Sequence, residues 1–92
     1  MNSFGRYLRN KREQLGLPLR KVAAELDIDT SILSKIERNE RLATKEMLPT
    51  LAKALKIQNK EIQIEFIQSI VLSELGDLEF LADGLKSVLK KI

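Results

Sequence analysis

The chain has 92 residues, 16 of them Lys or Arg against 13 Asp or Glu, and it contains neither cysteine nor histidine. This length allows one domain, or one small domain with an extension, that buries only about 60–65% of its unfolded surface. Without Cys and His we expect no disulfide, no zinc site of the Cys/His kind and no imidazole catalysis, and no cofactor is predicted. No segment approaches the ~20 apolar residues of a membrane-spanning helix, so we expect a cytoplasmic protein with no membrane partner.

The two parts of the chain differ in charge. Residues 1–58 carry a net charge of +5, and residues 59–92 carry −2. A polyanion would bind to the first part. We therefore expect a binding domain over 1–58 and an extension over 59–92.

The first helix is predicted over residues 3–15, ending at Gly16 in a left-handed cap. Arg12 lies four residues after Leu8 on its apolar face, and a cation directed toward a core is costly unless it is paired. Glu37, on a later helix, is the matching acid. We expect a structural ion pair between Arg12 and Glu37, and a loose, solvated pair is the alternative.

Residues 19–39 read as two short helices joined by a tight turn. Val22, Ala23 and Leu26 form the apolar face of the first helix. Asp27 stands in the turn, where a left-handed conformation is expected. The second helix follows Asp29, a residue suited to an N-cap, and continues to about Arg38. Asn39 is then the left-handed cap.

The outward face of this second helix carries small hydrogen-bonding side chains and one cation: Thr30, Ser31, Ser34 and Lys35. A helix face of this chemistry can enter the DNA major groove and reach base edges. The alternative is a solvated face on a helical hairpin.

Four motifs at these positions identify a family. They are Leu8-Arg9-x-x-Arg12, Val22-Ala23-x-x-Leu26, Leu33-Ser34-Lys35-Ile36-Glu37-Arg38 and Leu51-Ala52-x-x-Leu55. Residues 4–57 resemble a helix-turn-helix domain of the Cro/C1 repressor type, the Xre family. The resemblance implies an all-α, five-helix lambda-repressor-like domain, here with a C-terminal helical extension. It also implies binding of double-stranded DNA and the Arg12–Glu37 pair.

The resemblance suggests roles for the exposed polar residues. Thr30, Ser31, Ser34 and Lys35 would face bases, and Lys35 is the best candidate for a guanine contact. Pro18-Leu19 replaces the Ser/Thr-Gln common in the family, so Leu19 is expected to pack rather than to bind DNA. We expect phosphate contacts from five further residues, for which ordinary surface charge is the alternative: Arg20, Lys21, Arg38, Asn39 and Arg41. Arg6, Arg9 and Lys11 are assigned mostly to solvation.

Three more helices are predicted after residue 43. The first is capped by Thr44 and has Pro49 in its distorted first turn. The second, over residues 60–75, is capped by Asn59 and is apolar around most of its circumference, so it needs two neighbours. The third, over residues 78–91, follows Gly76-Asp77 and carries one apolar stripe.

These last two helices favour a homodimer, with contacts from Phe66, Ile70, Leu81, Leu85 and Leu89. Folding of the last helix onto its neighbour within one chain is the alternative. Attachment to a membrane surface is disfavoured, because the polar face carries both charge signs and few cations.

An enzyme is not expected, because no phosphate-binding glycine loop and no converging carboxylates are present. We predict a sequence-specific transcriptional regulator that binds a near-palindromic operator as a homodimer. The alternative is an interaction module, an antitoxin or adaptor whose C-terminal helices hold a protein partner. A restriction–modification controller is a narrower possibility that no residue selects.

Overall fold

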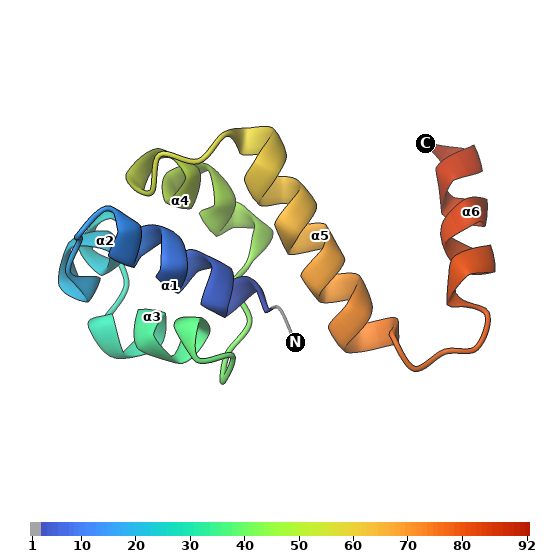
Figure 1. The fold of residues 1–92 in the computed structure, drawn as a ribbon, viewed down its shortest axis with the longest axis horizontal. Coiled ribbons are helices and arrows are strands. Elements are labelled where there is room, and N and C mark those ends of the chain that lie inside the picture. Colours follow the sequence, from blue (N-terminus) through green and yellow to red (C-terminus); the bar gives the residue numbers. More distant parts are fainter. Residues whose placement is uncertain (1–2) are drawn as a thin grey trace.

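A computed structural model describes residues 3–92, and this part of the chain forms helices without a β-strand. The elements are α1 (Phe4–Gln14), α2 (Leu19–Glu25), α3 (Thr30–Glu37), the 3-10 turn η1 (Lys45–Met47), α4 (Leu48–Ala54), α5 (Asn59–Leu75) and α6 (Leu81–Lys91). Helices α1 to α4 and the first half of α5 pack together, while α6 stands apart (Figure 1). The prediction of an all-α, five-helix domain with a helical extension is therefore confirmed.

The core is contributed by all five packed helices. Its largest fully buried side chains are Leu8, Val22, Leu33, Leu51 and Ile62. Ile62 lies in the first turns of α5, so the physical edge of the domain falls inside α5. Burial of each such side chain stabilises the fold by about 1.5–3 kcal/mol.

Left-handed residues end four of the helices. Gly16, Asp27 and Asn39 have φ of 67°, 56° and 61°, as the sequence predicts. Lys56 has φ of 55° after α4 and was not anticipated, because nothing in a lysine side chain favours this conformation. Of these residues, Asp27 lies between α2 and α3 and keeps their connection short.

Two predicted helix starts differ from the structure by one residue, and two predicted caps lack a capping hydrogen bond. Ser3 caps α1 rather than beginning it, since its hydroxyl accepts the Arg6 amide at 3.1 Å. Asn59 is the first residue of α5 and does not cap it. Asp29 and Thr44 stand at N-cap positions, but their side chains accept no capping hydrogen bond.

The last helix begins later than predicted. Residues 76–80 form successive turns, in which the Leu78 amide bonds the Leu75 carbonyl at 3.0 Å and the Leu81 amide bonds the Leu78 carbonyl at 3.2 Å. The residues that were expected to form the first turn of the helix belong to these turns instead. Helix α6 therefore begins at Leu81, and Asp77 does not cap it.

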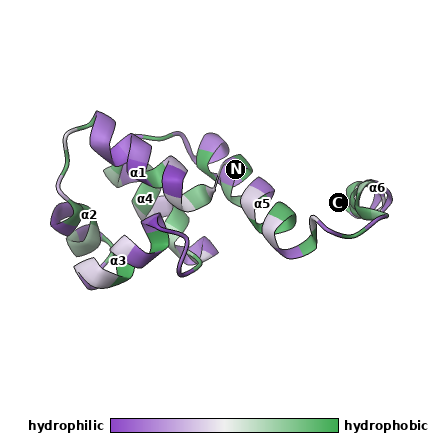
Figure 2. Ribbon diagram, turned by 60° about the horizontal axis from the view of Figure 1, so that its bottom comes forward, coloured by the Kyte–Doolittle hydropathy of each residue, from purple (hydrophilic) through white to green (hydrophobic). Residues whose placement is uncertain are grey.

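The extension makes the molecule elongated. The principal extents are 41 × 24 × 22 Å and the radius of gyration is 14.4 Å, against about 12 Å for a compact chain of this length. Hydrophobic positions recur along both α5 and α6 in Figure 2, where α6 again lies apart from α5. Within the described residues, no helix is both long and apolar enough to cross a bilayer.

Candidate nucleic-acid interface

The pair α2 and α3 is held by a small buried residue and a short turn. Ala23 is 1% exposed, and its small side chain permits α3 to approach α2 closely. The turn is closed by the Asp27 amide on the Ala24 carbonyl and by the Ile28 amide on the Ala23 carbonyl, both at 3.1 Å. Leu19 packs on the core beside these helices, as expected for a residue that does not contact DNA.

The outward side of α3 carries polar groups with no partner in the described chain. Thr30, Ser31 and Lys35 are exposed and Ser34 is half-buried. None of the four side chains takes part in a hydrogen bond or ion pair within residues 3–92. Their donors and acceptors are therefore free to bind an external ligand.

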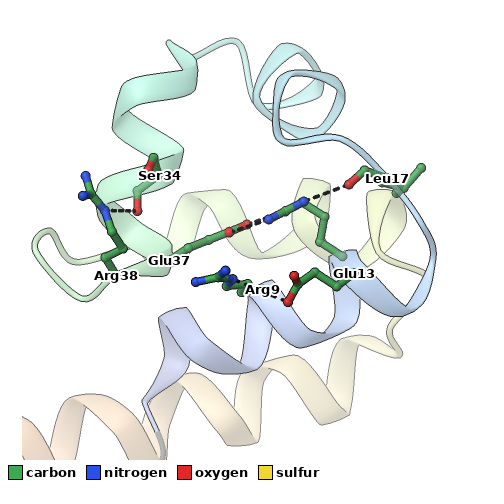
Figure 3. Close-up of polar contacts among 7 residues, drawn as sticks. Arg9, Glu13, Leu17, Ser34, Glu37 and Arg38 are labelled. Carbon is green, nitrogen blue, oxygen red and sulfur yellow. Dashed lines mark hydrogen bonds and ion pairs between the residues drawn. The ribbon is translucent and has the colours of Figure 1, made fainter.

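The inward side of α3 is locked to α1 by an ion pair. Arg12 Nε lies 2.8 Å from Glu37 Oε2, Arg12 Nη2 lies 3.0 Å from Glu37 Oε1, and Nη1 donates to the Leu17 carbonyl at 2.8 Å (Figure 3). Glu37 is only 7% exposed. The hydrogen bonds to Glu37 raise the pKa of Arg12, so the charge of the guanidinium is secure. This is the pair that the sequence predicts.

Gly5 brings α1 against the end of α3, and the sequence analysis missed it. A Cβ at this position would collide with the Ile36 carbonyl oxygen and would lie 2.9 Å from the Glu37 carbonyl oxygen and 2.8 Å from Asn39 Oδ1. Any larger side chain would therefore push the two helices apart. The signal was an isolated glycine inside a helical pattern, which indicates close backbone approach.

The residues expected to contact phosphates lie at both ends of the α2–α3 pair. Arg20 and Lys21 are exposed at the start of α2, and Arg38, Asn39 and Arg41 are exposed just after α3. Arg38 forms an exposed pair with Glu40, with Nε 3.3 Å from Oε2. Its guanidinium also lies 3.4 Å from the Ser34 carbonyl (Figure 3).

Two arginines of α1 lie close to the end of α3. Arg6 and Arg9 line a polar hollow together with Arg38 and Asn39. Arg9 Nε is 3.4 Å from Glu13 Oε1, and both side chains are more than half exposed. The sequence analysis assigned Arg6 and Arg9 mostly to solvation and did not place them beside α3.

A second polar link joins α1 to α5. The Tyr7 hydroxyl donates to Glu61 Oε2, and Lys11 Nζ lies 3.4 Å from the same oxygen. Burial and the bond to Glu61 raise the pKa of Tyr7. The bond from Tyr7, aided by the charge of Lys11, lowers the pKa of Glu61.

The apolar residues expected at a dimer interface fall in different environments. Phe66 packs edge-on against Phe4 of its own chain, with ring centroids 5.3 Å apart. Ile70 and Leu81 are half-buried, whereas Leu85 and Leu89 of α6 are 39% and 68% exposed. Among residues 3–92, no cluster of three or more acidic side chains is arranged to hold a metal ion.

Helices α2 and α3 are short and joined by a tight turn. Helix α3 is fixed to α1 on its inward side and carries polar side chains on its outward side, and this arrangement defines a helix-turn-helix fold. A family model described as helix-turn-helix matches residues 8–58, more than half of the chain. The chain belongs to this helix-turn-helix family, of the Cro/C1 or Xre type, whose members are DNA-binding regulators. Comparison with curated proteins and with solved structures found no match.

Proposed function

We propose that the protein binds specific sequences of double-stranded DNA as a homodimer and thereby regulates transcription. The observation that carries this proposal is the contrast between the two sides of α3. Its inward side is fixed to α1 by the Arg12–Glu37 pair, while the polar side chains on its outward side have no partner in the described chain. A rigid helix with free donors and acceptors suits the major groove.

Lys35 is the proposed main base contact, directed at the O6 and N7 acceptors of a guanine. The ammonium of lysine discriminates between bases less strongly than the planar guanidinium of arginine, which can form two parallel hydrogen bonds. Thr30 and Ser31 would donate to or accept from neighbouring base edges, and half-buried Ser34 would contact only a closely approaching group. Because hydroxyls discriminate weakly, the shape of the DNA would supply part of the specificity.

Phosphate contacts would surround this face. Lys21 and Arg20 would bind one strand at the start of α2, and Arg38, Asn39 and Arg41 would bind near the other end of α3. The hollow that Arg6 and Arg9 share with Arg38 supports adding these two arginines to the phosphate-binding set. The positive charge of the domain would also speed association with DNA.

A two-fold dimer would place one α3 in each of two successive major-groove turns. The operator should then be a near-palindrome with half-sites about 34 Å apart, or a multiple of that distance. The exposed apolar side chains of α5 and α6 support dimerisation, because monomers rarely expose contiguous apolar patches of this size.

Selection from a randomised duplex library tests this function. We expect enrichment of one motif with two inverted half-sites by the full chain at moderate salt. Enrichment of a single, asymmetric half-site would reject the dimer, and recovery of no motif at low salt would reject sequence-specific binding.

A second candidate function is that of an interaction module, such as an antitoxin or adaptor, that holds a different protein on its C-terminal helices. The exposed apolar residues of α6 favour it. The two roles make opposite predictions for Lys35→Ala combined with Arg38→Ala. A protein-binding scaffold would keep its activity in this variant, whereas a regulator that reads DNA would lose it.

A further inference from the structure

Nearly all of the exposed large hydrophobic side chains belong to the extension. Within residues 3–92, all of them except Leu15 and Leu42 lie between Ile64 and Ile92. Together these side chains leave on the order of 1,000 Å² of surface open to water, more than the ~800 Å² that each partner contributes to a standard interface. The extension therefore carries enough apolar surface for a stable, specific contact.

Two helix faces make up most of this surface, and the exposed Leu72, Leu78 and Phe80 lie outside them. The outer face of α5 is formed by Ile64, Ile67, Val71 and Leu75, which recur at helical spacing opposite the buried Ile62. The apolar face of α6 is formed by Leu81, Leu85, Val88, Leu89 and Ile92. An open apolar groove at residues 75–88 connects the end of α5 with α6, so the two faces are continuous.

The chain does not bring these two faces together. The hinge, residues 76–80, is ordered by its own turns, and α6 stands away from α5 in both views (Figures 1 and 2). Val88 and Leu89 remain 53% and 68% exposed. Apart from the groove where Leu75 lies near Leu85 and Val88, each face therefore lacks a partner in its own chain, and a second copy would supply a complementary face.

Charge along the extension favours the same contact. From Glu61 to Asp83 there are six acidic residues and no Lys or Arg, whereas residues 86–91 contain three lysines and no acid. Three of these acids lie on α5, and Glu61 is already bound to Tyr7 and Lys11, so Glu65 and Glu74 are the acids of α5 that would attract the lysine-bearing end of α6 in another copy. The acidic part is in turn unsuited to DNA or to an anionic membrane.

We propose that α6 is an exchanged arm: in the dimer, the apolar face of each α6 packs on the outer face of α5 in the other copy. A two-fold axis makes this contact self-complementary, so both helix faces of both chains are covered and no open-ended polymer forms. The proposal rests on the homodimer of the proposed function and specifies how that dimer is built.

Lengthening the hinge tests the exchange. Insertion of about six Gly and Ser residues after Asp77 would let each α6 fold back onto its own α5, because a longer hinge relieves the need to exchange. We expect light scattering to show twice the chain mass for the native protein and the mass of one chain for the lengthened one. The same residues added after Ile92 are the control and should leave the dimer intact.

Disulfide trapping gives an independent readout, since the chain has no cysteine of its own. An Ile67→Cys chain mixed with a Leu89→Cys chain should form mixed disulfide dimers. Replacement of the second chain by Arg20→Cys, on the DNA-binding domain, should abolish them. Circular dichroism of each variant checks that its helices are retained.

Three results would overturn the exchange. They are a native chain that stays monomeric at about 100 μM, a lengthened chain that stays dimeric, and disulfides only between two Ile67→Cys chains. A monomeric native chain that sediments with vesicles containing anionic lipid would assign the α6 face to a membrane surface instead. Mixed disulfide dimers with no motif from the duplex library would reject the DNA-reading function while leaving the exchange intact.

Discussion

Gly5 sets the distance between α1 and the end of α3. Gly5→Ala places a Cβ against the Ile36 carbonyl, so we expect a loss of about 1–3 kcal/mol of stability from overpacking. Gly84→Ala is the matched control, because a Cβ there meets nothing within 4 Å and the alanine should favour the helix. Urea unfolding measures both variants. Equal stability of native protein and Gly5→Ala would contradict the close approach.

Tyr7 and Glu61 couple α1 to α5 in a pH-dependent way. The pKa of Glu61 is lowered in the folded state. Its contribution to the free energy of unfolding is therefore fully present above the unfolded pKa of ~4.3 and is lost as the pH falls below that value. The pKa of Tyr7 is raised in the folded state. Its contribution to the free energy of unfolding is therefore complete below the unfolded pKa of ~10 and is lost as the pH rises above that value.

The stability difference between native protein and Tyr7→Phe should therefore be constant from about pH 5 to 9 and shrink on both sides. Chemical unfolding of the two proteins across this pH range measures the difference. A difference that stays the same down to pH 3 would show that the bond to Glu61 adds nothing.

At the scale of the element, the position of α3 depends on Arg12. Arg12→Met removes the partner of Glu37 and leaves a buried carboxylate unpaired, which costs about 3–5 kcal/mol. Arg9→Met is the matched control, since its exposed pair with Glu13 contributes about 0.3–0.5 kcal/mol. Thermal unfolding compares them. Similar melting temperatures for the two variants would show that the Arg12–Glu37 pair does not brace α3.

The elements from α1 to α4 were predictable because local chemistry determines them. Gly16 and Asn39 mark helix ends through their tolerance of the left-handed region, and an arginine on an apolar face needs an acid. The pairing of Arg12 with Glu37 was predicted from this need, and the family resemblance implied the same pair. Helix periodicity likewise placed Thr30, Ser31 and Lys35 on the exposed side.

The features that sequence reasoning missed depend on contacts between distant segments. The collision that excludes a side chain at Gly5 involves the backbone of α3, and the isolated glycine in the helical pattern did not show which distant segment comes close. The hollow beside Arg6 arises in the same way from the packing of α1 on α3. Helix α5 was predicted to need two neighbours, of which the described residues supply one, the packed domain, and the pattern did not show that Phe66 faces its own core.

At the scale of the whole molecule, charge and apolar surface are separated. The DNA-binding domain holds the excess cations, and the acidic extension holds the exposed hydrophobic residues. In the proposed dimer, exchanged arms would join two domains while each α3 faces outward. Specificity would then come from two half-sites. Because both chains carry the same substitution, the loss of one base contact would occur in both half-sites.

The central claim is that the outward side of α3 reads bases. Its most direct test is the ratio of affinities for the selected site and for a scrambled duplex at one salt concentration, measured for native protein and Lys35→Ala. We expect Lys35→Ala to lose about 1–3 kcal/mol on the selected site and much less on the scrambled one. Lys60→Ala, on the exposed start of α5, should lower neither affinity appreciably. An unchanged ratio in Lys35→Ala would contradict the base-reading role.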